Sequence, residues 1–198
     1  MIIRDLDIAC DDVYFVAKLI YHTDQELFPL VFGREKAALR NISALIRGEG
    51  NRYSHRNIII AEEKGYIFGI LISHGIIRDK KAERKEHASI FGFWGGVKLD
   101  VIGTLLEKFV LTSVKSEKEK YISNISVRPE SRGKGIGGAL IDQAVSDAAV
   151  AGYKAIFLDV SLKNLRAREL YERKGFKVVK TNSVFFNTGA YSMCREIC

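Results

Sequence analysis

The sequence predicts a mixed α/β domain in which helices flank one central sheet. Residues 121–127 mix apolar and small polar side chains, as a strand with one covered face does, and four glycines after Pro129 lead into apolar residues at helical spacing. Residues 58–73 have the pattern of a β-hairpin, and residues 13–46 contain two amphipathic helical patterns. Because 198 residues suit one domain, we expect a single domain over 1–198.

The first elements follow from apolar spacing. Residues 2–6 predict a short strand, and either Asp11 or Asp12 can cap the helix over 13–21. Its apolar face is formed by Val13, Val16, Ala17, Ile20 and Tyr21. A loop rich in aromatic and acidic side chains, residues 23–33, leads to a second helix that ends before Gly48.

The hairpin is predicted with strands at 58–61 and 66–73, joined by the turn Glu63-Lys-Gly65. Residues 76–118 then form an insertion that is charged at first and rich in glycine and aromatic residues later. A long loop of this composition can form an acceptor pocket or a lid. The alternatives are that it packs as extra core or is buried against a second subunit.

The carboxyl-terminal elements are also spaced regularly. The helix after the glycines runs to Ala151, with Gly152 in the position of a C-terminal cap. Residues 155–160 predict a strand, and Asn164 opens a short helix that Gly175 closes. The last two strands are expected at 176–180 and 191–195.

The glycine turn predicts an anion site. Gly133, Gly135, Gly137 and Gly138 let the backbone approach a ligand closely, and they lie where a helix begins. Free N–H groups and the positive end of the helix dipole meet at that place. Because Arg132 and Lys134 add formal charge, the turn is expected to hold a phosphate group.

A dinucleotide site is the alternative interpretation of the turn. Residues 133–138 satisfy G-x-G-x-x-G, and Asp159 follows at about the distance at which that fingerprint places an acidic residue. However, residues 128–132 separate the strand from the first glycine, and too little chain follows for further βαβ units. A P-loop is excluded because no G-x-x-x-x-G-K-(S/T) is present.

Composition narrows the class further. The chain has no apolar run of about 20 residues and no leading signal-peptide pattern, so we expect no membrane association. Three cysteines without a C-x-x-C predict reduced thiols, a cytoplasmic location and no zinc site. The net charge of +7 is spread among acidic residues, so nucleic acid is not an expected partner. The histidines show no paired spacing, and no metal is expected.

Two blocks of the sequence resemble the GCN5-related N-acetyltransferase (GNAT) family. The core signature of that family, (R/Q)-x-x-G-x-(G/A) after a strand ending in V-x-P, is present as Val127-Arg-Pro129 and Arg132-Gly-Lys-Gly135-Ile-Gly137. The following family motif, N-x-x-A-x-x-(L/F)-Y-x-x-x-G-F, matches at every position from Asn164 to Phe176. The resemblance covers residues 120–180 firmly and the amino-terminal half in pattern only.

The resemblance implies a fold and a co-substrate. The fold would be the acyl-CoA N-acyltransferase fold, a mostly antiparallel sheet with one parallel, splayed strand pair. The co-substrate would be acetyl-CoA, with its diphosphate on the glycine turn and its pantetheine arm along the strand edge. The positions that the family assigns to this binding are Ile125, Ser126, Val127, Arg132, Gly133, Lys134, Gly135, Ile136, Gly137, Gly138, Asn164, Ala167 and Tyr171.

Catalytic roles are also implied by the resemblance. Tyr171 would be the general acid that protonates the leaving thiolate, and the alternative is a buried structural tyrosine. Many family members carry a basic carboxylate on the strand before the glycines, but this strand offers Tyr121, Ser123 and Asn124. The base therefore stays unassigned, with Glu26 and Asp24 as candidates beside the alternatives of a solvated loop or a water chain.

These features predict an enzyme that moves an acetyl group from acetyl-CoA to an amine by direct transfer in a ternary complex. The alternative is a non-catalytic acyl-CoA-binding regulatory module, which would not need the tyrosine. The acceptor is an amine on a small molecule or on a protein, and the chain is expected to be a monomer or a homodimer.

Overall fold

The structure, a computed structural model, describes residues 1–23, 28–29, 34–76, 116–184 and 188–197. Its first elements are β1 (Ile2–Asp5), α1 (Val13–Tyr21), α3 (Glu35–Arg47), the 3₁₀ turn η1 (His55–Asn57), β2 (Ile58–Glu63) and β3 (Tyr66–His74). The later ones are β4 (Glu119–Val127), the 3₁₀ turn η2 (Pro129–Ser131), α6 (Ile136–Val150), β5 (Ala155–Ser161), α7 (Leu165–Arg173), β6 (Lys177–Val184) and β7 (Thr188–Glu196). The predicted mixed α/β class is confirmed.

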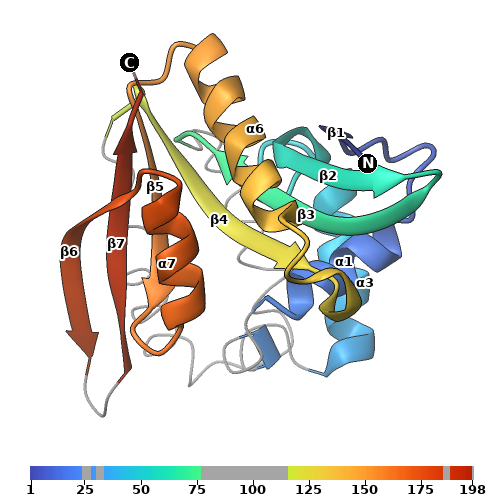
Figure 1. Ribbon diagram of the computed structural model, residues 1–198. Coiled ribbons are helices and arrows are strands. Elements are labelled where there is room, and N and C mark those ends of the chain that lie inside the picture. The colour runs from blue at the N-terminus through green and yellow to red at the C-terminus, as the bar shows by residue number, and fades with distance from the viewer. Residues whose placement is uncertain (24–27, 30–33, 77–115, 185–187, 198) are drawn as a thin grey trace.

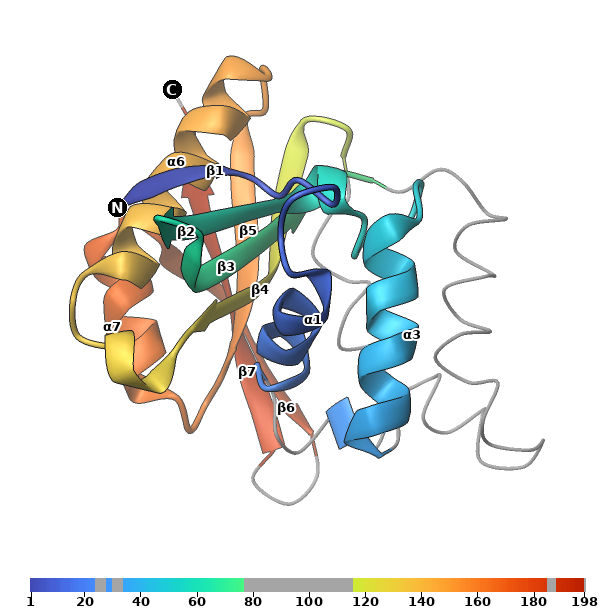
Figure 2. The same cartoon turned by 90° about the vertical axis from the view of Figure 1, so that its right-hand side faces the viewer.

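The described strands form one sheet in the order β1-β2-β3-β4-β5-β7-β6. Neighbouring strands are antiparallel except β4 and β5, which are parallel. This arrangement confirms the expected single parallel pair, and it excludes the doubly wound parallel sheet of a dinucleotide-binding fold. The sheet lies between two helical layers, with α1 and α3 on one side and α6 and α7 on the other (Figure 2).

Each face of the sheet has its own apolar core. Between the sheet and α1 and α3, the buried cluster is drawn entirely from residues 6–72. Between the sheet and α6, the second cluster takes residues from both ends of the chain, from Ile59 to Met193. The predicted apolar positions of α6, from Ile136 to Ala148, are all buried in this second cluster. The helical period therefore identified the buried face of α6 correctly.

Local signals in the sequence set most element ends. Asp12 rather than Asp11 caps α1, because its carboxylate accepts from the amide of Phe15 at 2.9 Å, whereas Asp11 is paired with Arg4. Gly152, with φ of 79°, follows α6 as expected. The last two strands are longer than predicted, because β6 and β7 continue their pairing from Lys177 to Val184.

Two predicted features fall largely or wholly outside the described residues. The insertion at 76–118 is described only at residue 76 and from 116 onward, and the base candidates Glu26 and Asp24 are not described. No helix in the described part of the chain is long and apolar enough to cross a membrane.

Candidate active site

The parallel strands β4 and β5 separate part of the way along their length. They pair from Glu119 with Ala155 to Ile122 with Leu158, and the pairing then stops although both strands continue (Figure 1). A register shift in the β3–β4 ladder, between Ile72 and Ser73, leaves Ser123 as an extra residue at this point. Because a bulge bends the strand that contains it, Ser123 turns β4 away from β5 and opens the gap.

The main chain of β4 presents groups to this gap. The amide of Arg128 donates to the carbonyl of Phe68 on β3. In an antiparallel ladder, every second residue before Arg128 therefore also turns its N–H and C=O groups toward β3. Ser126 therefore faces β3, while Ile125 and Val127 turn their N–H and C=O groups toward the gap. One of these groups is already used, since the Val127 carbonyl accepts from Nε of Arg132 at 3.1 Å.

The glycine turn lies at the open end of the gap and has the geometry of an anion site. Gly133 and Gly135 have φ of 80° and 81°, a left-handed conformation that glycine adopts without strain. Gly135 precedes α6 directly and supplies no side-chain cap. The amides of residues 133–138 donate no hydrogen bond within the described part of the chain. Three of them, from Ile136, Gly137 and Gly138, are the first amides of α6, which have no partner inside the helix.

Space and charge at the turn suit an anionic ligand. A Cβ atom added at Gly135 would meet no atom of the described residues within 4 Å. One added at Gly133 would lie 4.0 Å from Nη2 of Arg166. Arg166 belongs to α7 and is exposed, like Arg132 and Lys134. Arg166 was not among the predicted site residues, because only the packing of α7 on α6 brings it to the turn.

The helix α7 packs closely against the start of α6. A Cβ atom at Gly137 would lie 3.6 Å from Leu170, and one at Gly138 would lie 2.9 Å from the side chain of Lys174. Asn164 caps α7, because its Oδ1 accepts from the amide of Ala167 at 3.1 Å. These contacts bring the predicted residues of α7 and of the glycine turn to the same end of the gap.

Tyr171 extends from α7 toward the sheet. It packs against the second core cluster, with its ring centroid 6.1 Å from that of Phe176. Burial raises the pKa of Tyr171 to about 12, so its hydroxyl stays protonated at neutral pH. Among the residues that the structure describes, none forms a hydrogen bond with this hydroxyl. Tyr171 therefore offers a proton that no described neighbour takes.

A second polar group lies where the two strands part. Tyr121 of β4 donates its hydroxyl to Oδ2 of Asp159 on β5 at 2.9 Å, and Asp159 follows the last paired residue, Leu158. Burial, and then the charge of Asp159, raises the pKa of Tyr121 well above its usual range, and the Tyr171 phenol adds to the effect. The ring of His74 meets the Tyr121 ring edge-on at 5.8 Å. Sequence reasoning noticed both members of this pair but not their contact.

Comparison with known proteins agrees with this geometry. A sequence model described as the acetyltransferase (GNAT) family matches residues 20–176. The chain is 37% identical over 90 residues to N-acetyltransferase 8B of Homo sapiens, covering 46% of this chain and 39% of that protein. It is 39% identical over 88 residues to mycothiol acetyltransferase of Propionibacterium freudenreichii subsp. shermanii, and this match covers 42% of this chain and 27% of that protein. The matches therefore span well under half the length of these relatives.

Solved structures show the same fold over the whole chain. The N-acetyltransferase from Staphylococcus aureus Mu50 superposes with a TM-score of 0.73 at 18% identity, covering 98% of this chain and 100% of that one. A crystal structure of another acetyltransferase gives a TM-score of 0.69 at 23% identity over the full length of both chains. Because the family match extends over more than half of its residues, the chain belongs to the acetyltransferase (GNAT) family.

Proposed function

We propose that this chain is an N-acetyltransferase that moves the acetyl group of acetyl-CoA to an amine by direct transfer in a ternary complex. The observation that carries the proposal is the gap between β4 and β5. The amides of the glycine turn, which donate to no described residue, lie at its open end, and the protonated Tyr171 comes from α7, which contacts β5. Acyl transfer needs an anchor for the carrier and a proton donor for the leaving sulfur, and these two features supply both.

The residues present fit the diphosphate of CoA. The amides from Gly133 to Gly138 would donate to it, and the open space beside Gly135 admits it without a steric conflict. The side chains of Arg132, Lys134 and Arg166 would balance its charge. A single phosphate needs fewer donors than this, so a diphosphate uses the turn more completely.

The edge of β4 fits the amide-rich pantetheine arm. Ile125 and Val127 turn main-chain groups toward the gap, so the arm can pair with them as an added strand would. Ser126 keeps its own main chain on β3 and would hold this edge in place. Asn164 and Ala167, which are bonded to each other at the start of α7, would line the opposite side.

Tyr171 would act as the general acid. When bound, acetyl-CoA supplies an activated acetyl group as a thioester, and its departing thiolate needs a proton. The Tyr171 hydroxyl carries a proton at neutral pH, because burial raises its pKa to about 12. A phenol with this pKa keeps its proton until a stronger base, the developing thiolate, appears beside it.

The competing function is a non-catalytic acyl-CoA-binding module. Such a module would use the glycine turn and the β4 edge in the same way, but it would have no use for an unbonded phenol at the gap. The Tyr171 hydroxyl, which no described residue engages, favours the enzyme. The acceptor would be an amine on a small molecule or on a protein. The free thiols of Cys10 and Cys194 support a reducing compartment such as the cytoplasm.

Two measurements test this proposal. In a thermal-shift experiment, acetyl-CoA and CoA should raise the melting temperature and NAD should not, because only a ligand of the folded state stabilises it. Mass spectrometry should then detect an acetylated product with at least one amine. The amines would be a peptide with a free α-amino group, a lysine peptide, spermidine and an aminoglycoside. Stabilisation by acetyl-CoA without any product would instead support the binding module.

A further inference from the structure

The structure points to a second reactive group at the gap, the carboxylate of Asp159 aligned by Tyr121. We propose that Asp159 is the base that receives the proton of the attacking amine and that Tyr121 is the residue that positions it. This inference rests on the proposed acetyltransferase function and supplies the base that was left unassigned because Tyr121, Ser123 and Asn124 offer no carboxylate.

Location is the first argument. Asp159 is the first residue of β5 beyond the last β4–β5 pair, so its carboxylate lies at the vertex where the gap begins. Tyr121 and Asp159 come from the two strands that form the gap, and their hydrogen bond of 2.9 Å closes the vertex. An amine that attacks a thioester held along this gap meets the carboxylate at its inner end.

The neighbouring groups are the second argument. Tyr121 is 7% exposed, and its raised pKa means that it donates to Asp159 and cannot itself accept a proton near neutral pH. The Tyr171 phenol contributes to the raised pKa of Tyr121, so the proposed acid acts electrostatically on the residue that positions the proposed base. An ionised carboxylate has about four lone-pair sites, so the hydrogen bond from Tyr121 does not by itself exhaust its capacity to accept a proton.

Among the described residues, His74 and Arg52 are titratable or charged groups that lie near this pair or act on it. His74, on β3, is half-buried, and burial lowers its pKa to about 4, so its imidazole is neutral under physiological conditions. The charge of Arg52 acts on both His74 and Tyr121. His74 uses Nδ1 on the carbonyl of Gly75, 2.9 Å away. A base with so low a pKa is a weaker proton acceptor than an imidazole in water.

The proton balance of the reaction closes with these residues. Asp159 takes one proton from the ammonium form of the acceptor before attack and passes it to solvent. It takes a second proton from the same nitrogen as the new C–N bond forms and the thioester C–S bond breaks. Tyr171 gives one proton to the departing thiolate. Afterwards Asp159 returns its second proton to solvent and Tyr171 regains one from solvent, so acetylation of an ammonium releases one net proton.

Asp159→Asn tests the base directly. The variant should lower kcat by about 10² to 10⁴-fold, the usual contribution of a general base, while stabilisation by acetyl-CoA is retained. The loss should shrink as pH rises. An asparagine can use only amine that is already neutral in solution, and that fraction increases tenfold per pH unit below the amine pKa, about 8 for an α-amino group. A purely structural role would give a loss that does not depend on pH.

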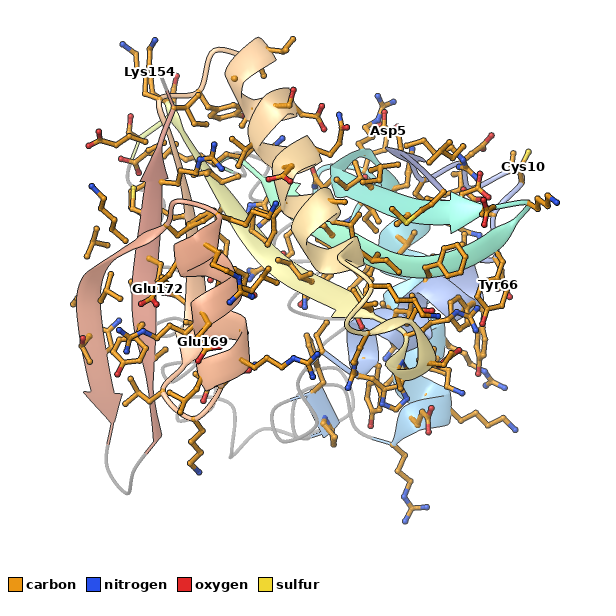
Figure 3. The ribbon with its side chains drawn as sticks, in the orientation of Figure 1. Asp5, Cys10, Tyr66, Lys154, Glu169 and Glu172 are labelled. Atoms are coloured by element: carbon orange, nitrogen blue, oxygen red, sulfur yellow. The ribbon has the colours of Figure 1, made fainter. Side chains whose placement is uncertain are left out.

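Two further variants make the test decisive. Tyr121→Phe removes only the donor hydroxyl, and it should lower kcat about tenfold while leaving the KM for acetyl-CoA unchanged. This variant carries the test if Asp159→Asn does not fold. Glu169→Gln is the matched control, because Glu169 is an exposed carboxylate of α7 (Figure 3) and its loss should leave kcat unchanged.

The outcomes separate this inference from the function on which it rests. If Asp159→Asn keeps kcat within about threefold of the unsubstituted chain, or if Tyr121→Phe has no effect, Asp159 is not the base and the acetyltransferase proposal stands. If the unsubstituted chain binds acetyl-CoA but acetylates no amine in the panel, both proposals are overturned.

Discussion

The two sides of the β4–β5 gap are built differently. On one side, β1 to β4 are covered by helices on both faces, and an apolar cluster drawn from residues 6–72 fills the space under α1 and α3. On the other side, β5 to β7 are covered by α7, a helix in which no residue is fully buried. The outer strand β6 leaves Val178 and Val179 exposed.

This difference indicates a division of roles. The amino-terminal side is closed by packing, so its side chains mostly stabilise the fold. The carboxyl-terminal side contributes fewer buried contacts and places polar groups, Asp159 and Tyr171, at the boundary with the other side. We therefore expect substitutions at the boundary to alter turnover and substitutions on the amino-terminal side to alter stability.

The largest expected effect is at the boundary. Tyr171→Phe should lower kcat by about 10² to 10⁴-fold, because it removes the proton donor without emptying the space the ring fills. The melting temperature and its increase with acetyl-CoA should stay close to those of the unsubstituted chain. Steady-state kinetics with thermal-shift controls measures both. Unchanged turnover would mean that Tyr171 is not the general acid. The boundary would then have no demonstrated role in turnover.

The next effect concerns stability on the amino-terminal side. Burial lowers the pKa of His74 to about 4, against 6.5 in the unfolded chain, so below pH 6.5 the unfolded state binds more protons. Stability should therefore fall as pH drops from 6.5 to 4, by up to about 3 kcal/mol from this residue. Urea unfolding at pH 7.5 and 4.5 measures the loss. His74→Gln should flatten it.

A smaller loss of stability is expected where β3 and β4 approach closely. A Cβ atom at Gly69 would lie 2.7 Å from the carbonyl oxygen of Ser126 and 3.2 Å from Val127. Gly69→Ala should cost about 1–3 kcal/mol, because the backbone of β4 must move to admit the methyl group. Chemical denaturation measures the change. A neutral result would mean that the two strands adjust more freely than this spacing implies.

The smallest effect compares two glycines of the turn. Gly135→Ala places a side chain on a residue with φ of 81°, which costs about 1–2 kcal/mol, and fills the proposed diphosphate site. Gly137→Ala lies within α6, with its nearest neighbours at 3.6 and 3.8 Å, and should be neutral or slightly stabilising. Only the first should weaken acetyl-CoA binding by calorimetry. If Gly135→Ala binds acetyl-CoA as tightly as the unsubstituted chain, the turn around Gly135 is not the anchor.

Sequence patterns were enough to predict the local structure. The helical period identified the buried face of α6, and Asn164 caps α7 as its residue type suggested. The pair of Tyr121 with Asp159 was not predicted, because the two residues are 38 positions apart and meet only through the parallel register of β4 and β5. Arg166 reaches the glycine turn because α7 packs on α6, and no local pattern encodes that packing.

The bulge at Ser123 also explains why Tyr121 and Asn124 lie on the same side of the sheet. In an uninterrupted strand, positions 121 and 124 differ by an odd number, so their side chains would lie on opposite faces. The bulge shifts the alternation by one residue. Asn124 donates to the hydroxyl of Thr23 beneath α1, and Tyr121, which pairs with His74, lies on the same side. Ile122 enters the core under α6. Removing Ser123 would keep this parity but straighten β4. Ser123 therefore sets the width of the opening without deciding which face of the sheet the Tyr121 phenol occupies.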